Sequence, residues 1–482
     1  MEFVLNNKVV LRGISDTRII DEIKDFLTIT NPQYKLLQNL DKWTGATPET
    51  LKLYDEDLSD NPHMIICPRG FADQAYRICR DHKEKIIFID QRRELKDVEM
   101  QFHGSLRDFQ EAAVSGPLFK KQHGVLSAGT GSGKTVMALY IIARRRQPAL
   151  VVVHTVELLY QWLERIDTFL GIPPEDVGIV GDGRFRTGRK ITVGLYQTIR
   201  KRLGDLNPLI GQLVVDECHK CPSKTFTEAV SGFEAKYRLG LTATEYRRDG
   251  LEKLIFITIG ELRHIIGKAP LIETGDLCRA RVICRKTDFD TTLDPSNAYP
   301  QVIKELTMDE PRNRLICRDI ASDSHPGIKL ILTDRRDHAL TMERILFENH
   351  GLTSTVLTGT TPRNQREAIV KALTIGEISI LIATGQLIGE GFDLPELAIL
   401  FLVTPIKFRG RLIQYIGRIL RPAQGKAEGI IYDYMDMNVG VLQASAVSRI
   451  EIYRREGIVV DEKCSGNDQM IMDNEFLGKS DT

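Results

Sequence analysis

The 482-residue sequence contains no long apolar run. No stretch reaches the roughly 18 to 20 apolar residues that a membrane-spanning helix requires. The opening letters, MEFVLNNKVVLRG, lack the charged and then hydrophobic layout of a signal peptide. We therefore expect a cytoplasmic protein with no membrane partner.

A surplus of charge is also missing, because Lys plus Arg and Asp plus Glu each total 65. The overall basic footprint of many nucleic-acid binders is therefore absent, and a polyanion would have to bind in a local groove. Cysteine is sparse: eight residues over this length predict no disulfide framework, and most are expected to be small core residues. With 42% hydrophobic residues, the chain can form the cores of about two to four domains.

Short apolar runs alternate with amphipathic helical patterns along most of the chain. Strands that are apolar throughout and lie between helices predict α/β folds with parallel sheets covered on both faces. The strand candidates are residues 64–67, 85–90, 125–127, 149–153, 191–193, 213–215, 237–239, 329–332, 379–382 and 399–403. The predicted divisions are a small α/β accessory domain, a candidate for DNA binding, at 1–100, an α/β domain at 101–285, a linker at 286–300, a second α/β domain at 301–460 and an acidic, disordered tail at 461–482.

The segment GVLSAGTGSGKT, residues 124–135, runs from a predicted strand through a glycine-rich loop into a predicted helix. Such a loop turns successive backbone N–H groups towards phosphate oxygens, and the helix N-terminus adds positive partial charge. Lys134 would contact the β- and γ-phosphates of ATP, and the Thr135 hydroxyl would bind Mg²⁺. The predicted phosphate-binding set is Gly129, Thr130, Gly131, Ser132, Gly133, Lys134 and Thr135. The alternative is a flexible glycine turn.

The stretch VVDECHKC has two interpretations. In the first, an apolar strand delivers Asp216 to Mg²⁺ and Glu217 to the attacking water, which Glu217 orients and deprotonates. Asp216 and Glu217 then join Thr135 as candidate metal ligands. In the second, Cys218 and Cys221 bind zinc or transfer electrons, but a zinc site needs two further ligands and no second C-x-x-C exists. The first interpretation is favoured.

Further motifs in the same order resemble those of the superfamily 2 helicases. They are LRDFQ at 106–110, LTAT at 241–244, ATG through GEGFDLP at 383–395 and QYIGRILRP at 414–422. The resemblance is to the DExH branch that contains the restriction-enzyme motor subunits, the XPB helicases and the phage helicase UvsW. It implies two tandem RecA-like parallel-sheet domains that hydrolyse ATP with Mg²⁺. It also implies DNA, single-stranded, forked or branched, as the partner.

The resemblance assigns roles to individual residues. Those expected at the nucleotide are Arg107 and Gln110 beside the adenine, Gly391 and Asp393 of the fifth motif, and Gln414, Arg418 and Arg421 in catalysis. Those expected to couple hydrolysis to motion are His219, Thr242 and Thr244. Independently of the family, two arginines three residues apart share one face of a helix, and planar guanidinium groups stabilise charge that builds on the γ-phosphoryl oxygens. The alternative is a solvated helix with two arginines.

Nucleic-acid contacts are expected from hydroxyls, amides and a few cations. By resemblance, the candidates are Thr155, Gln197, Arg335 and Thr384. Independently, residues 183–190 form a predicted loop in which Arg184 and Arg186 surround an aromatic, which fits a backbone contact or a stacking wedge. A solvated basic turn is the alternative interpretation.

The sequence therefore predicts an ATP-dependent DNA helicase or branch-migrating translocase, in the host cytoplasm if a phage encodes it. Replication, recombination and repair are the expected settings, with replication or recombination proteins as partners. Three alternatives stay open: an RNA helicase, an ATP-gated nucleic-acid clamp or annealing protein, and the motor half of a nuclease.

Overall fold

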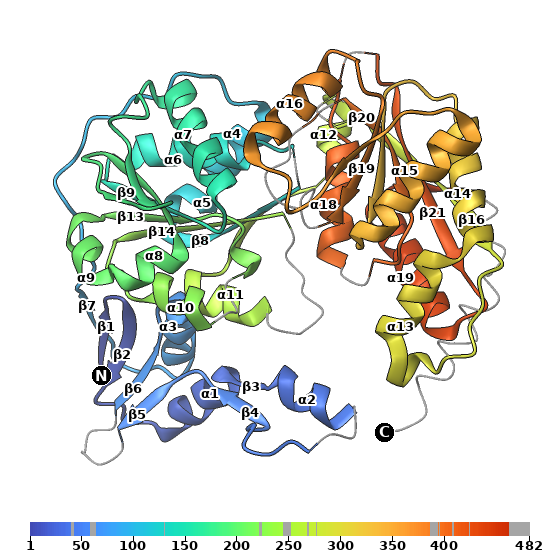
Figure 1. The fold of residues 1–482 in the computed structure, drawn as a ribbon. Coiled ribbons are helices and arrows are strands. Elements are labelled where there is room, and N and C mark those ends of the chain that lie inside the picture. Colours follow the sequence, from blue (N-terminus) through green and yellow to red (C-terminus); the bar gives the residue numbers. More distant parts are fainter. Residues whose placement is uncertain are drawn as a thin grey trace. The chain divides into compact units, whose positions relative to one another are not determined.

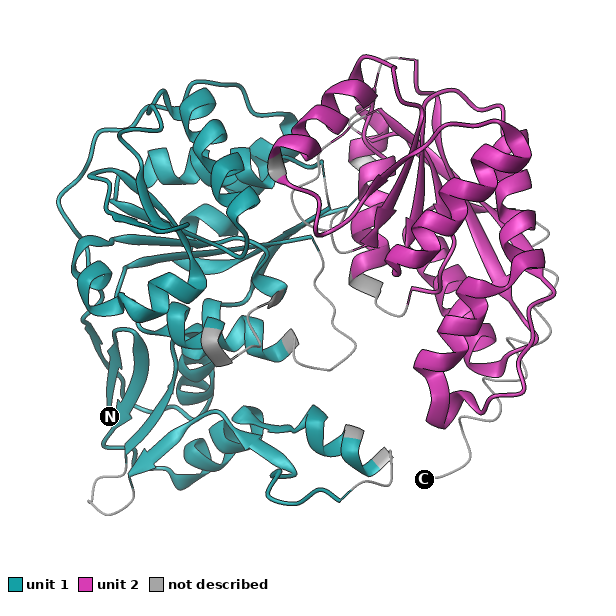
Figure 2. Ribbon diagram, viewed as in Figure 1, with its two compact units in different colours: residues 1–267 teal, residues 268–482 magenta. Residues whose placement is uncertain are grey.

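A computed structural model describes residues 1–39, 43–57, 64–129, 131–220, 224–243, 252–267, 269–275, 277–385, 394, 396–406, 409–423 and 425–461. The chain divides into two compact units, which Figure 2 colours separately: the first unit is residues 1–267 and the second unit is residues 268–482. None of the helices in the described part of the chain is long and apolar enough to cross a membrane.

The first unit begins with a five-stranded sheet in the order β5-β6-β2-β1-β7. Its strands are β1 (Glu2–Leu5), β2 (Lys8–Arg12), β5 (Asp55–Asp57), β6 (Met64–Pro68) and β7 (Ile87–Asp90), and β3 (Thr28–Thr30) pairs with β4 (Thr50–Lys52) nearby. The helices of this segment are α1 (Thr17–Leu27), α2 (Pro32–Asn39), η1 (Arg69–Phe71) and α3 (Ala72–Asp81). Ile19 and Ile23 of α1 and Ala75 and Ile78 of α3 pack with Leu11 of β2 in one apolar core.

The rest of the first unit is an eight-stranded sheet in the order β11-β10-β12-β9-β13-β14-β8-β15. The strands are β8 (His123–Ala128), β9 (Ala149–Val153), β10 (Gly178–Gly181), β11 (Arg184–Arg186), β12 (Ile191–Leu195), β13 (Gln212–Val215), β14 (Tyr237–Thr242) and β15 (Leu262–Ile266). All pairs are parallel except β10 with β11. This confirms the predicted α/β class.

Helices cover both faces of this sheet. They are α4 (Asp108–Ser115), α5 (Pro117–Lys120), α6 (Lys134–Arg145), α7 (Val156–Leu170), α8 (Tyr196–Lys201), α9 (Leu203–Leu206), η2 (Asn207–Leu209), η3 (Cys218–Lys220), α10 (Lys224–Ser231) and α11 (Glu252–Ile259). Figure 1 shows α6 and α7 on one side of the sheet and α8, α10 and α11 on the other. Helix α7 begins where the Thr155 hydroxyl accepts a hydrogen bond from the backbone N–H of Leu158, and it ends at Gly171, whose φ of 60° suits glycine.

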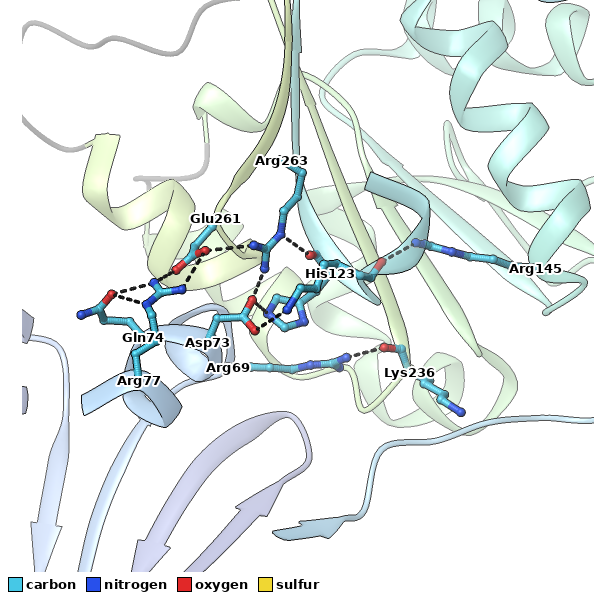
Figure 3. A network of polar contacts seen from close by, with 10 residues as sticks. Arg69, Asp73, Gln74, Arg77, His123, Arg145, Lys236, Glu261 and Arg263 are labelled. Carbon is cyan, nitrogen blue, oxygen red and sulfur yellow. Dashed lines mark hydrogen bonds and ion pairs between the residues drawn. The ribbon is translucent and has the colours of Figure 1, made fainter. Parts of the chain in front are cut away.

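A polar network anchors the N-terminal sheet to the eight-stranded sheet (Figure 3). The guanidinium of Arg69 is buried and donates to the carbonyl oxygens of Ala235 at 2.5 Å and Lys236 at 2.6 Å, just before β14. Beside it, Asp73 of α3 pairs with Arg263 of β15 and lies 3.3 Å from His123 Nε2 of β8. The N-terminal sheet and the eight-stranded sheet are therefore joined by side chains that are buried, as Arg69 and His123 are, or mostly buried, as Asp73 and Arg263 are.

The second unit contains a seven-stranded, fully parallel sheet in the order β18-β19-β17-β20-β21-β16-β22. Its strands are β16 (Arg279–Thr287), β17 (Ile328–Thr333), β18 (Thr355–Leu357), β19 (Ile380–Thr384), β20 (Leu397–Leu402), β21 (Glu428–Asp436) and β22 (Val459–Val460). The helices are α12 (Ala269–Glu273), α13 (Pro295–Met308), α14 (Glu310–Ser322), α15 (Arg336–His350), α16 (Arg363–Thr374), α18 (Arg409–Ile419) and α19 (Gly440–Arg455). Apolar residues of α14 and α15 pack on the central strands.

The predicted boundary at residue 285 lies too late in the chain. Strand β16 pairs with β21 along its whole length, from Arg279 opposite Glu428 to Thr287 opposite Asp436. It therefore belongs to the seven-stranded sheet of the second unit. The predicted linker at 286–300 likewise contains the end of β16 and the start of α13. A strand is visible in local pattern, but the sheet that it joins depends on a partner far along the chain. The predicted tail lies outside the described residues from 462 onwards.

His338 of α15 is buried in the second unit with both ring nitrogens engaged. Its Nδ1 lies 2.9 Å from Thr333 Oγ1, and its Nε2 lies 2.9 Å from Asn313 Oδ1. Burial, together with the nearby charge of Arg312, lowers the pKa of His338 from 6.5 to about 3. The native protein therefore holds this imidazole neutral.

Acidification is expected to destabilise the protein through His338. Below pH 6.5 the imidazole of His338 is protonated in the unfolded chain but stays neutral in the native state. The free energy of unfolding therefore falls as the pH drops towards the native pKa of about 3. The loss approaches about 1.4 kcal/mol per pH unit for one group. Thermal unfolding between pH 7 and pH 5 measures it. The melting temperature of His338→Gln should depend less on pH than that of the wild type; equal slopes would contradict the assignment.

Candidate active site

The glycine-rich loop connects β8 to α6. Gly131 and Gly133 have φ values of 88° and 76°, in the left-handed region that favours glycine. A Cβ on Gly133 would lie 2.3 Å from Nε2 of Gln110, whereas among the described residues no atom lies within 4 Å of the Cβ position on Gly129. The loop is therefore closed on the Gln110 side and open at Gly129. Thr130 lies outside the described residues.

Side chains of the loop hold its backbone in this shape. Lys134 Nζ donates to the carbonyl oxygens of Ala128 at 2.7 Å and Gly129 at 3.2 Å. The buried Ser132 donates its hydroxyl to the same Gly129 oxygen at 2.7 Å. Thr135 is half-buried in the first turn of α6. The lysine ammonium and the threonine hydroxyl thus come from the N-terminal turn of one helix.

Gln110 of α4 bridges the loop and the preceding segment. Its Oε1 accepts from the backbone N–H of Arg107 at 3.0 Å, and its Nε2 donates to the carbonyl oxygen of Ser132 at 2.9 Å. A primary amide has one further N–H and one further lone pair, which suit paired hydrogen bonds to an adenine edge.

Two adjacent carboxylates follow β13. Asp216 is buried, and its Oδ2 accepts a hydrogen bond from Trp162 Nε1 at 2.9 Å. Glu217 adopts a φ of 49°, a strained value for a residue with a side chain, and its backbone N–H donates to Asp216 Oδ1 at 2.9 Å. Burial and then the charge of Glu217 raise the pKa of Asp216 to about 6, while the bond from Trp162 and the charge of Lys134 oppose the rise. Strands β8 and β13 run parallel on either side of β14, so the loops that follow them lie at the same edge of the sheet.

His219 contacts both Glu217 and the third motif. Its Nδ1 lies 3.1 Å from Glu217 Oε2 and 3.3 Å from Thr242 Oγ1. Thr242 ends β14, which lies between β13 and β8 in the sheet. A continuous set of polar contacts therefore runs from a candidate base to the end of the neighbouring strand. Thr244 lies outside the described residues.

The residues at this edge fit a nucleoside triphosphate with a divalent metal. The loop is open at Gly129, and the N-terminus of α6 follows it. Oxygen donors of the kind that Mg²⁺ prefers come from Thr135, Asp216 and Glu217, and Mg²⁺ usually keeps waters and phosphate oxygens as its other ligands.

The zinc interpretation finds no support. Cys218 is fully buried, and burial raises the pKa of its thiol well above the ordinary value, which disfavours the thiolate that binds metals. Cys221 lies outside the described residues. Within the described ranges, no group of three or more His, Cys, Asp or Glu side chains is placed to hold a metal ion.

In the second unit, α18 carries Gln414 and Arg418 one turn apart on a partly exposed face. Arg421 does not share that helix as predicted, because α18 ends at Ile419 and Arg421 lies in the turn that follows. Pro422 next in the sequence explains the early end, since proline disfavours helical conformation in the residue before it. Gly391 and Asp393 lie outside the described residues.

The predicted nucleic-acid residues of the first unit follow strands β9 and β12, which are neighbours in the sheet. Thr155 caps α7, and Gln197 is exposed on α8. In the second unit, Thr384 ends β19 opposite Thr333 of β17, and Arg335, two residues after Thr333, is the N-cap residue of α15. Arg335 also donates to the carbonyl oxygen of Pro300 at 2.9 Å. Each unit therefore brings its candidates together at the carboxyl edge of its own sheet.

The predicted basic loop at 183–190 is instead a hairpin that includes β11, the edge strand of the sheet. The guanidinium of Arg186 donates to backbone carbonyls of the segment before β10, including that of Val177 at 2.6 Å, so Arg186 stabilises the fold locally. Arg184 is exposed, and the guanidinium carbon of Arg202 lies 4.7 Å from the ring centre of the exposed Phe185. The hairpin therefore keeps Arg184, rather than Arg186, as a cation accessible to a ligand.

Comparison with known proteins finds a family match in each of the two units. Residues 75–247 match the family model described as type III restriction enzyme, res subunit, and residues 312–423 match the helicase conserved C-terminal domain. A protein of Sulfurisphaera tokodaii named DNA 3'-5' translocase XPB2 is 28% identical over 360 residues, which cover 67% of this chain and 80% of that protein. Helicase D10 of Escherichia phage T5, named as probable, is 27% identical over 337 residues, 69% of this chain and 72% of the phage protein.

A solved structure supports the fold. A fragment named as an HsdR subunit of a type I restriction enzyme from Vibrio vulnificus YJ016 superposes with a TM-score of 0.58 at 17% identity, covering 89% of this chain and 81% of that chain. Together with the residues at the carboxyl edge of the eight-stranded sheet, these matches identify the protein as an ATP-hydrolysing helicase. These matches support an assignment to superfamily 2, in the branch that includes the restriction-enzyme motor subunits and the XPB helicases.

Proposed function

We propose that this protein is an ATP-dependent DNA helicase or translocase that unwinds or branch-migrates DNA. The observation that carries the proposal is the set of contacts at the ends of β8, β13 and β14. There His219 contacts both Glu217 and Thr242, and Lys134 lies beside them. The relative named as a DNA 3'-5' translocase supports DNA as the substrate. Roles in replication, recombination or repair, and partners from those processes, belong to the same proposal.

The chain's own residues act as follows. Lys134 binds the terminal phosphates, while Thr135 and Asp216 hold Mg²⁺, which when bound supplies positive charge beside the phosphate oxygens. Glu217 accepts a proton from the attacking water. His219, which lies within 3.3 Å of both Glu217 and Thr242, transmits the state of the site to β14.

The remaining residues extend the proposal to the second unit and the nucleic acid. Gln110 and Arg107 bind the adenine. Gln414, Arg418 and Arg421 stabilise charge on the phosphoryl group, with Gly391 and Asp393 assigned by resemblance alone. The proposed strand contacts are Thr155, Gln197, Arg184, Arg335 and Thr384, whose hydroxyl, amide and guanidinium donors suit a phosphate backbone.

ATP hydrolysis measured with five additions tests the proposal: no nucleic acid, single-stranded DNA, duplex DNA, a four-way junction and RNA. Glu217→Gln serves as the blank. We expect DNA, and the junction most of all, to raise turnover at least about tenfold, equivalent to about 1.4 kcal/mol of transition-state stabilisation. Strand-displacement assays then follow on the same substrates.

Other outcomes would replace the proposal. Stimulation by RNA alone would indicate an RNA helicase. Hydrolysis without strand displacement would favour the ATP-gated clamp or annealing protein, and movement along duplex DNA without strand separation would favour a motor that serves a separate nuclease chain.

A further inference from the structure

In the second unit, the end of β19 is held by a side chain from α18. Tyr415 is 2% exposed, and its hydroxyl donates to the carbonyl oxygen of Gly385 at 2.7 Å. Gly385 directly follows Thr384, a proposed strand contact. A Cβ on Gly385 would lie 2.6 Å from the Tyr415 hydroxyl oxygen and 2.9 Å from Asp334 Oδ1. This approach is therefore possible only because residue 385 is glycine.

Tyr415 lies on α18 between the residues assigned to the nucleotide. Gln414 precedes it, and Arg418 follows three residues later in the same helix. Burial raises the pKa of the Tyr415 hydroxyl to about 12, so the group keeps its proton and remains a donor at physiological pH. A helix of this length moves largely as a rigid element, so a displacement at Tyr415 also displaces Arg418 one turn away.

The neighbouring loop after β17 is fixed to the same place. The backbone N–H of Asp334 donates to Thr404 Oγ1 at 3.1 Å, and that of Arg335 donates to Thr333 Oγ1 at 3.3 Å. Thr333 lies opposite Thr384 in the sheet. Arg335 and Thr384, the two proposed nucleic-acid contacts of the second unit, therefore lie at the same edge of that sheet. The contact from Tyr415 to Gly385 joins this edge to α18.

We propose that Tyr415 is a positioning residue that couples nucleic-acid contact at the end of β19 to the α18 residues serving ATP hydrolysis. The inference rests on the proposed function. A phosphate bound at Thr384 fixes the Gly385 carbonyl, and the hydrogen bond from Tyr415 then fixes the helix that bears Gln414 and Arg418. Without the hydroxyl, strand binding no longer orders that helix.

Other buried tyrosines of the second unit make a different kind of contact. Tyr432 donates to Asp323 Oδ1 at 3.0 Å, and Tyr453 donates to Asp433 Oδ2 at 2.8 Å. Both bonds end on carboxylates of the core, whereas that of Tyr415 ends on the backbone of a proposed ligand-binding loop. Tyr432→Phe therefore removes a comparable buried hydrogen bond and provides the matched control.

The test compares wild type, Tyr415→Phe and Tyr432→Phe in the full chain. The quantities measured are basal ATP turnover, maximal turnover with single-stranded DNA, and DNA affinity by fluorescence anisotropy. For Tyr415→Phe we expect basal turnover and DNA affinity within about twofold of wild type, and stimulated turnover reduced about three- to tenfold, the size expected for one hydrogen bond. Tyr432→Phe should retain full stimulation.

A second variant, Gly385→Ala, should show the same loss, because the added methyl displaces the tyrosine hydroxyl. Normal stimulation of Tyr415→Phe, or an equal loss in Tyr432→Phe, would overturn the coupling while leaving the proposed function intact. Loss of basal turnover in Tyr415→Phe in proportion to stimulated turnover would indicate a structural role instead. A wild-type protein that no nucleic acid stimulates would overturn both proposals.

Discussion

Glu217→Gln is expected to lower ATP turnover at least about 100-fold while leaving ATP affinity within a few-fold of wild type. The amide preserves the size of the side chain but cannot accept the proton of the attacking water. Asp216 and Lys134 are untouched, so the nucleotide still has its proposed ligands. Phosphate release at saturating nucleic acid measures turnover, and titration with a fluorescent nucleotide measures binding.

The matched control is Glu164→Gln, which makes the same change at an exposed position on α7. It should behave as wild type. Wild-type turnover in Glu217→Gln would remove this residue as the base. Lys134→Ala gives a complementary pattern, with both binding and turnover lost, because the ammonium is the proposed phosphate ligand and its charge also keeps the neighbouring Asp216 more acidic.

Arg69→Met is expected to produce the largest loss of stability. The guanidinium is fully buried and makes hydrogen bonds of 2.5 Å and 2.6 Å to the carbonyl oxygens of Ala235 and Lys236. Methionine fills similar volume but leaves both acceptors without these charged donors, at about 1.5 to 3 kcal/mol each. Relief of the buried charge offsets part of this loss, because burial and the nearby Arg238 already lower the pKa of Arg69 well below its ordinary value.

The net expectation for Arg69→Met is a loss of about 3 kcal/mol, or a fall on the order of 6 to 12 °C in the melting temperature of the first unit. Differential scanning calorimetry measures the change, and Arg165→Met, an exposed position on α7, is the control. Gly70→Ala should weaken the same junction, since its Cβ would lie 2.3 Å from the carbonyl oxygen of Phe256. An unchanged melting temperature in Arg69→Met would show that the N-terminal sheet does not depend on this anchor.

Local pattern was enough to predict many strands. The run Ala149–Val153 is apolar throughout and flanked by helical patterns, and the structure makes it β9 at those bounds. The phosphate loop was equally visible, because the strand, the glycines, Lys134 and the helix that together shape it are contiguous. Where neighbouring residues carry the whole signal, periodicity and turn chemistry suffice.

Local pattern was not enough to predict which sheet a strand joins, what an arginine side chain contacts or where a helix ends. Strand β16 has an alternation of apolar and polar residues, but only its pairing with β21 shows that it belongs to the seven-stranded sheet of the second unit. Arg186 has the composition of a ligand-binding cation, yet carbonyl groups of the preceding segment occupy its guanidinium. Arg421 matches its motif in spacing, although the helix ends before it.

The sequence by itself determined the class of chemistry: a phosphate loop, two adjacent carboxylates and an arginine motif in helicase order. Only the tertiary structure decided which distant side chains support them. Three hydrogen bonds join residues that are 54, 30 and 166 positions apart: those from Trp162 to Asp216, from Tyr415 to Gly385 and from Arg69 to Ala235. Such pairs leave no periodic mark in the sequence, because a hydrogen bond depends on where folding brings the donor and the acceptor and not on their spacing along the chain.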